Sequence, residues 1–187
     1  KNFSEQLYTP WKNSLSEPWE QWLEIINEFT ASLAKLFNAK QSEFCPQINL
    51  SSGLTKILMS LDRAQKKNCV ILVSEIDFPG MGFALQKSLP KDCEIRFIPS
   101  NIDITNASVW DEYLTKDVDL VFVSHAYSNT GQLSPISEVL SMARSRNIIS
   151  ILDIAQSVGV VPIDLKALKS LNWMNILIMN CAVTVIK

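Results

Sequence analysis

Polar side chains that could do chemistry follow two apolar runs in the second half of the chain. Ser124 and His125 come directly after the first run, and Asp153 ends the second, with Gln156 close behind. An aspartate at the end of an apolar run is costly to bury unless it meets a cation or hydrogen-bond donors. Asp153 therefore indicates a site for a positively charged ligand group.

The elements that carry these side chains can be predicted from the pattern around them. The runs 120–123 and 148–152 are apolar without alternation apart from Ser150, which is typical of strands covered on both faces. Between them apolar residues recur at helical spacing after Pro135, a residue that suits a helix start. The stretch is thus a strand–helix–strand unit. Ligands of open parallel sheets bind beyond the carboxyl ends of the strands, where the polar residues fall.

Similar strand-like segments begin near residues 69, 94, 118, 147 and 175. This spacing fits a strand followed by a crossover helix. We therefore expect an α/β fold of three layers, with a mostly parallel sheet between helices. Residues 1–40 differ, because they are rich in tryptophan and in helix formers, and from Trp19 on their spacing predicts an amphipathic helix with its apolar stripe inward. Trp11, Trp19 and Trp22 are expected to pack in the core. The expected organisation is a helical segment, 1–40, and a single domain, 41–187.

Composition excludes several other classes of protein. The chain has 187 residues, of which 47% are hydrophobic and 19% charged, and a net charge of -2, so nucleic acid is not an expected partner. Its apolar stretches are too short to cross a membrane. The four cysteines are dispersed, without a CxxC pair or a histidine cluster, so no metal site is predicted. Reduced, buried thiols in a cytoplasmic protein are the expectation.

Two segments together carry a resemblance to a known family. The stretch 153–165, DIAQSVGVVPIDL, resembles the cofactor-binding segment of the class V pyridoxal-phosphate enzymes, and the loop 124–131, SHAYSNTG, is closest to that of the kynureninases. At Gln156 the sequence is more similar to the cysteine desulfurases, since kynureninases usually have histidine at that position. The resemblance runs from about Phe3 to Cys181 and implies pyridoxal 5'-phosphate as the cofactor. It also implies the large domain of the fold-type I enzymes, shortened so that the smaller carboxyl-terminal domain is absent.

The resemblance assigns six residues to the cofactor, namely Leu50, Ser51, Phe78, Ser124, Asp153 and Gln156. The first two, at a helix start whose N–H groups favour an anion, and Ser124 would hold the phosphate. Phe78 would stack on the pyridine ring, Asp153 would keep its nitrogen protonated, and Gln156 would contact the phenolate or phosphate side. Taken alone, Ser51 also fits a plain helix cap, and Phe78 a core aromatic. Met81 departs from the family pattern, which has aspartate there.

The family's Schiff-base lysine is the missing part. Its motif position falls on Val183, or on Thr184 with one residue more, which leaves Lys187 as the candidate. The resemblance implies hydrolytic carbon–carbon cleavage of an amino acid, as in kynureninase, by a homodimer. Two alternatives stay open: a catalytically inactive or fragmentary relative, and a cysteine desulfurase or transaminase. A Ser124–His125–Asp153 hydrolase triad is also conceivable, although no GxSxG elbow surrounds the serine.

Overall fold

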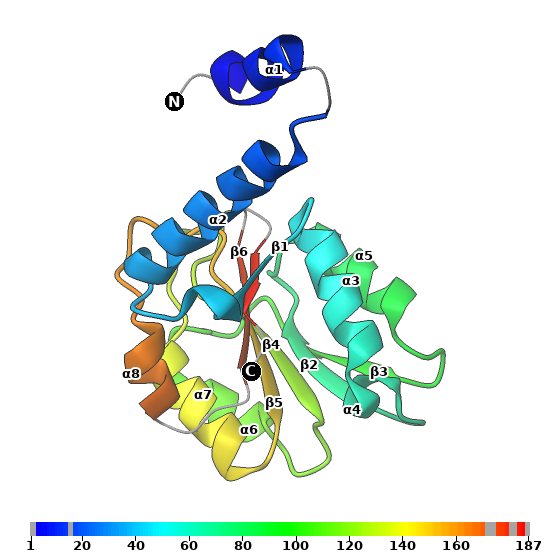
Figure 1. Cartoon of the computed structure of the whole chain (residues 1–187). Coiled ribbons are helices and arrows are strands. Elements are labelled where there is room, and N and C mark those ends of the chain that lie inside the picture. Colours follow the sequence, from blue (N-terminus) through cyan, green and yellow to red (C-terminus); the bar gives the residue numbers. More distant parts are fainter. Residues whose placement is uncertain (1–2, 15–16, 171–174, 180–182, 186–187) are drawn as a thin grey trace.

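The computed structural model describes residues 3–14, 17–170, 175–179 and 183–185, the last two stretches by their backbone. Figure 1 shows a twisted sheet between helices, with a helix standing apart at the amino terminus. The strands are β1 (Phe44–Pro46), β2 (Val70–Ser74), β3 (Glu94–Ile98), β4 (Leu120–Ser124), β5 (Ile149–Asp153), β6 (Asn175–Met179) and β7 (Val183–Val185). The helices are α1 (Phe3–Asn13), α2 (Trp19–Leu36), α3 (Leu50–Ser60), α4 (Asp62–Gln65), α5 (Pro79–Ser88), α6 (Ala107–Tyr113), α7 (Ile136–Ser145) and α8 (Leu165–Ser170), with a 3-10 turn at Gln41–Glu43.

The strands form one sheet in the order β1-β7-β6-β5-β4-β2-β3. From β3 to β6 all neighbours are parallel, as predicted, and β7 is antiparallel to both β6 and β1. Each of the five predicted strands is present near its expected start. The two short strands β1 and β7 were not predicted, because three residues are too few to show a periodic pattern.

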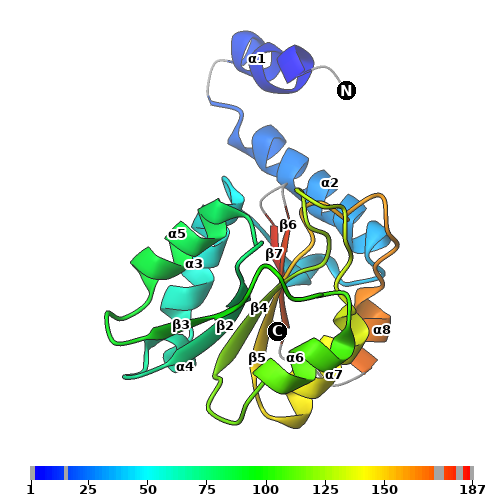
Figure 2. The same cartoon turned by 180° about the vertical axis from the view of Figure 1, so that it is seen from behind.

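Helices cover both faces of the sheet, which confirms the three-layer prediction. One core cluster joins α2, α6, α7 and α8 to one face, and the other joins α3, α4 and α5 to the opposite face. Figure 2 shows the same division from behind, with α6 and α7 on one side and α3 and α5 on the other. The central strands are buried along their whole length, since β2, β4 and β5 have no exposed residue. This double cover explains why their sequences do not alternate.

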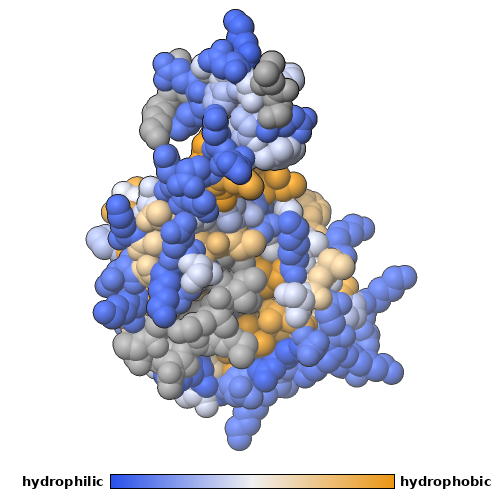
Figure 3. All heavy atoms as spheres, viewed as in Figure 1, coloured by the Kyte–Doolittle hydropathy of each residue, from blue (hydrophilic) through white to orange (hydrophobic). Residues whose placement is uncertain are grey.

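The amino-terminal helices behave differently from the prediction. The carboxyl end of α2 is anchored in the core by Leu33 and Phe37, but Trp11 and Trp19 are each 58% exposed. The expected core packing of these tryptophans is therefore wrong. Trp22 is half-buried and its indole donates to the Leu7 carbonyl (3.3 Å), which ties α1 to α2. In Figure 3 apolar surface gathers where these helices meet the rest of the molecule.

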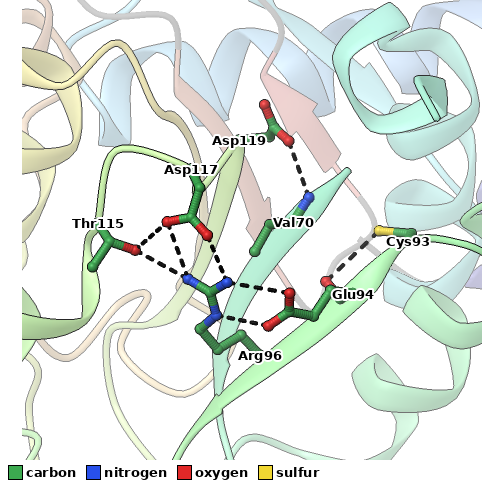
Figure 4. Close-up of polar contacts among 7 residues, drawn as sticks. All are labelled: Val70, Cys93, Glu94, Arg96, Thr115, Asp117 and Asp119. Carbon is green, nitrogen blue, oxygen red and sulfur yellow. Dashed lines mark hydrogen bonds and ion pairs between the residues drawn. The ribbon is translucent and has the colours of Figure 1, made fainter. Parts of the chain in front are cut away.

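Charged side chains are paired at the sheet end opposite the strand tips that carry Ser124 and Asp153. Arg96 of β3 bonds to Glu94 (2.8 Å) and to Asp117 (2.7 Å), as Figure 4 shows. Nearby, Asp119 accepts from the Val70 N–H (3.0 Å) at the start of β2. Arg96 is thus committed to structural pairing, and it is not available to a ligand at the other end of the sheet.

The cysteines correct the expectation of reduced, buried thiols. Cys69 and Cys93, which directly precede β2 and β3, form a disulfide, and Cys45 on β1 is free and exposed. Parallel pairing of β2 with β3 starts at Val70 and Glu94, so the two cysteines are brought side by side by the register. Cys181 lies outside the described residues.

Candidate functional site

Strand register lines up the candidate residues at the carboxyl edge of the sheet. Ser124 of β4 pairs with Asp153 of β5, Asp153 with Ile178 of β6, and Ile178 with Thr184 of β7. Neighbouring strands are about 4.8 Å apart, so Thr184 is roughly 10 Å along this row from Asp153. The row therefore connects the predicted cofactor residues with the motif position of the family's lysine.

A cavity of about 270 Å³ opens beside this row, near the lower limit for small-molecule sites. All six residues assigned to the cofactor line it, although they come from four separate stretches of the chain. The remaining lining residues are Ile48, Asn49, Ile76, Met81, Ala126, Tyr127, Ser128 and Ala155. Asp153 is the only one of the described lining residues that carries a formal charge at neutral pH. The structure thus places in one cavity the six residues that the sequence assigned separately.

Asp153 lies at the wall of this cavity and is 7% exposed. Its Oδ1 accepts from the Ala155 N–H (2.8 Å), which holds the carboxyl group at the strand end. Burial raises the pKa of Asp153 to about 6, and the bond from Ala155 partly opposes that rise. Within the part of the chain that the structure describes, no cation pairs with Asp153. A cationic ligand group would relieve the cost of its buried charge.

The start of α3 supplies hydrogen-bond donors to the same cavity. Asn49 is the N-cap, since its Oδ1 accepts from the Ser52 N–H (2.8 Å). Ser51 is therefore not the cap that its sequence alone would allow. The N–H groups of Leu50 and Ser51 belong to the first turn, where a helix offers no internal acceptor. These two cavity-lining residues consequently suit an anionic group.

Phe78 lies at the lip of the cavity, directly before α5. It is 58% exposed, so it is not the core aromatic that its position alone would allow. A Cβ at Gly80 would come within 3.1 Å of the Phe78 ring, which shows how closely the ring lies against the first turn of α5. Met81, where the family has aspartate, is 2% exposed and belongs to the core beneath α5 while touching the cavity. Phe78 thus offers a flat apolar face to a ligand ring.

Sequence reasoning missed Asp77, which sits behind Ser124. The Ser124 hydroxyl donates to Asp77 Oδ1 (2.6 Å), and the Ser74 N–H donates to Asp77 Oδ2 (2.8 Å). Burial raises the pKa of Asp77 to about 7, and the charge of Asp153 adds to that rise. The signal that singled out Asp153, an acid just past a buried strand, is also present here, because Asp77 follows β2 by three residues.

His125 does not form a triad with its neighbours. Its Nδ1 is 2.8 Å from the Ser157 hydroxyl, and its backbone N–H donates to the Asp153 carbonyl (2.8 Å). The Ser124 hydroxyl donates its hydrogen bond to Asp77 instead of to His125. Burial also lowers the pKa of His125, which favours the neutral ring. The hydrolase alternative therefore lacks its geometry.

The position of the family's Schiff-base lysine falls near the end of the chain. Lys187, the candidate from the sequence, lies outside the described residues. Val183 and Thr184 are placed by their backbone as the first two residues of β7, at the edge of the sheet where the cavity opens.

Comparison with known proteins agrees with this geometry. Residues 1–171 match the family model "Aminotransferase class-V". The chain belongs to the class-V aminotransferase family. An uncharacterized aminotransferase of Schizosaccharomyces pombe is 26% identical over 163 residues, covering 86% of this chain and 41% of the yeast protein. A kynureninase of Shouchella clausii is 23% identical over 166 residues, covering 83% and 39%. The chain thus spans about two fifths of the length of these relatives.

Solved structures share the fold. A cystine C-S lyase in complex with its product cysteine persulfide superposes with a TM-score of 0.83 at 22% identity, covering 98% of this chain and 52% of the lyase. Another structure of that lyase, with glycine covalently linked to its PLP cofactor, has a TM-score of 0.81 at 21% identity, with coverages of 98% and 51%. A cysteine desulfurase of Thermococcus onnurineus gives 0.77 at 18% identity, with coverages of 98% and 48%. This likeness establishes the fold-type I architecture.

The described residues contain neither a candidate membrane span nor a candidate metal cluster. None of the helices in this part of the chain is both long and apolar enough to cross a membrane. No group of three or more histidine, cysteine, aspartate or glutamate side chains there could hold a metal ion.

Proposed function

We propose that this chain is the cofactor-binding domain of a pyridoxal-phosphate enzyme that acts on a small-molecule amino acid. Membership of the class-V family supports the cofactor. The observation that carries the proposal is the cavity at the carboxyl edge of the sheet. There an exposed aromatic ring and a helix start meet a buried carboxylate that has no cationic partner among the described residues. These are the groups that a cationic ring with a phosphate tail needs from a protein.

Each cavity residue has a role in this proposal. Asp153 holds the pyridine nitrogen in its protonated form, since a buried carboxylate without another cation favours a positive partner. Phe78 lies against the ring, and Leu50 and Ser51 donate to the phosphate from the start of α3. Gln156, which is exposed at the cavity, contacts the phenolate or phosphate side.

The phosphate is held by neutral donors in this arrangement. No lysine or arginine is found among the described residues that line the cavity. Backbone N–H groups and hydroxyls at a helix start can bind an anion without a cation, because the helix dipole favours negative charge there. Among the described lining residues the formal charge therefore comes from Asp153, and a cationic ligand group would compensate it.

When bound, pyridoxal phosphate withdraws electrons from the bonds around the α-carbon of an amino acid. Within this class we favour hydrolytic carbon–carbon cleavage, as in kynureninase, acting in a homodimer. The kynureninases among the relatives support this choice. Cysteine desulfurase or transaminase chemistry is the alternative within the same family.

We also propose that the domain begins after residue 40 and that the protein is cytoplasmic. The Cys69–Cys93 disulfide is the observation against a cytoplasmic location, because disulfides are more usual in an oxidising compartment.

A catalytically inactive relative is the second candidate function. The observation that favours it is the presence of Val183 and Thr184 where the family places its lysine. Such a protein would retain the cofactor through Asp153, Phe78 and the start of α3 without a covalent bond. The first candidate requires Lys187 to act as the Schiff-base lysine.

Borohydride trapping separates the two candidates. The chain is mixed with pyridoxal phosphate, reduced with borohydride and digested, and the modified peptide is identified by mass. Label on Lys187 supports the enzyme, whereas spectroscopic binding without specific label supports the inactive relative. Val183→Lys provides the positive control, since a lysine there is expected to become labelled; Lys116, exposed and remote from the cavity, reports nonspecific labelling. Absence of any cofactor binding would contradict both candidates.

A further inference from the structure

Ser124 and Asp77 form a pair in which only one member faces the cavity. Ser124 is 5% exposed and lines the cavity, whereas Asp77 is not one of its lining residues. The Ser124 hydroxyl has a single proton, and it points at Asp77 Oδ1 over 2.6 Å. Ser124 therefore turns its lone pairs toward the cavity when Asp77 is ionised.

The second oxygen of Asp77 is fixed by the backbone. Its Oδ2 accepts from the Ser74 N–H (2.8 Å), a group that can only donate. Oδ1 is the favoured site for a proton taken up by Asp77, because its partner, the Ser124 hydroxyl, can also accept a hydrogen bond. The bond between the two side chains then reverses, and the Ser124 proton becomes free to point into the cavity.

We propose that Asp77 is a positioning residue whose protonation state decides whether Ser124 offers the cavity a hydrogen-bond donor or an acceptor. The proposal rests on the proposed function, because a donor at Ser124 matters only for an anionic oxygen such as that of a phosphate. Protonated Asp77 favours such a ligand, and ionised Asp77 disfavours it.

The surroundings of Asp77 place this switch near neutral pH. The groups that face it are Ser74 from β2, Ser124 from β4, Asp153 from β5 and Tyr127 from the loop after β4, and none of these described groups is a cation. Burial raises the pKa of Asp77 to about 7, and burial likewise raises that of Tyr127, which stays neutral. His125 is directed to Ser157 instead.

Asparagine at this position imitates the protonated state permanently. In Asp77→Asn the amide oxygen can accept from the Ser74 N–H, and the NH₂ group can donate to the Ser124 hydroxyl. Ser124 is then a donor to the cavity at every pH. The variant should therefore bind an anionic ligand more tightly than the natural chain above pH 7 and about equally below it.

The test is a double-mutant cycle on pyridoxal phosphate binding, measured by absorbance at about pH 6 and about pH 8.5. Natural chain, Asp77→Asn, Ser124→Ala and the double variant are compared, so that the titration of the ligand cancels. Asp77→Asn is expected to increase the affinity for pyridoxal phosphate when Ser124 is present. At the higher pH this increase should be about ten times the increase measured with alanine at position 124. This ratio should fall to about one at the lower pH. A ratio of one at both values would mean that Asp77 acts only through its charge, which overturns the proposal.

A second measurement needs no cofactor. The carboxyl carbon of Asp77 is titrated by NMR in the natural chain and in Ser124→Ala. The hydrogen bond from Ser124 lowers the pKa of Asp77. Its loss in Ser124→Ala should therefore raise the titration midpoint of Asp77 by about 0.5 to 1 pH unit. An unchanged midpoint overturns the link between the two residues. If the midpoint moves but pyridoxal phosphate does not bind the natural chain, the proposed function fails while the link between Asp77 and Ser124 stands.

Discussion

Ser124 and Asp153 are register partners at the carboxyl ends of the adjacent parallel strands β4 and β5. Just past this pair the His125 N–H still donates to the Asp153 carbonyl (2.8 Å), so the ladder continues while the side chains become polar. A hydroxyl and a carboxylate thereby reach the same cavity from neighbouring strands. Rigid strands position both groups, which explains how a site can be precise although loops complete it.

Removing the Phe78 ring should weaken cofactor binding without loss of stability. Phe78→Ala is expected to raise the Kd for pyridoxal phosphate about tenfold, because the stacked face is lost. The free energy of unfolding should change little, as the ring is 58% exposed. Phe83→Ala is the matched control, since Phe83 lies on α5, is 67% exposed and does not line the cavity. Equal Kd values for the two variants would exclude Phe78 from the site.

Asp77 should make the ligand-free chain less stable as pH rises. Its folded pKa, about 7, lies above the ordinary 3.8, so between these values the folded state holds a proton that the unfolded state has lost. The free energy of unfolding therefore falls as pH rises through this window. Asp77→Asn should be more stable than the natural chain by roughly 1–3 kcal/mol at about pH 8, and equal to it near pH 4.

Urea unfolding at these two pH values measures the difference. Asp103 gives a control of opposite sign, because bonds from the Thr105 hydroxyl and N–H hold the pKa of Asp103 below its usual value. Asp103→Asn should therefore not be stabilising at about pH 8. A stability difference for Asp77→Asn that is the same at both pH values would contradict the buried position of Asp77.

The Cys69–Cys93 disulfide should be found by mass spectrometry without reduction. Digestion of the natural chain is expected to give a peptide pair linked through these residues. Breaking the bridge in Cys93→Ser should lower the free energy of unfolding by about 2–4 kcal/mol in the oxidised protein. Cys45→Ser, which removes the free exposed thiol, should have little effect. Two unlinked, alkylatable thiols at Cys69 and Cys93 would contradict the disulfide and support the reduced state expected from the sequence.

Much of the fold could be predicted because its signals are local. Each central strand is an apolar run covered on both faces, and each begins near its predicted residue. Asp153 could be singled out because a carboxylate is rare at the end of such a run. The α7 helix was predicted after Pro135, and Pro135 is its N-cap.

The rest depends on contacts between distant segments, which no local pattern records. Asp77 and Ser124 are 47 residues apart, and only the packing of β2 beside β4 brings them together. The exposure of Trp11 and Trp19 could not be predicted either, since helical spacing shows an apolar stripe but not what it faces. The disulfide required the register of β2 and β3.

The central claim is that Asp153 binds the cation of pyridoxal phosphate, and titration of the ligand by absorbance tests it most directly. Asp153→Asn keeps the shape of the side chain, and Glu138→Gln on the exposed side of α7 is the control. The Kd should rise at least about 100-fold in Asp153→Asn, because one partner of a buried ion pair is lost, and stay unchanged in the control. An Asp153→Asn variant that binds pyridoxal phosphate as tightly as the natural chain would contradict the claim.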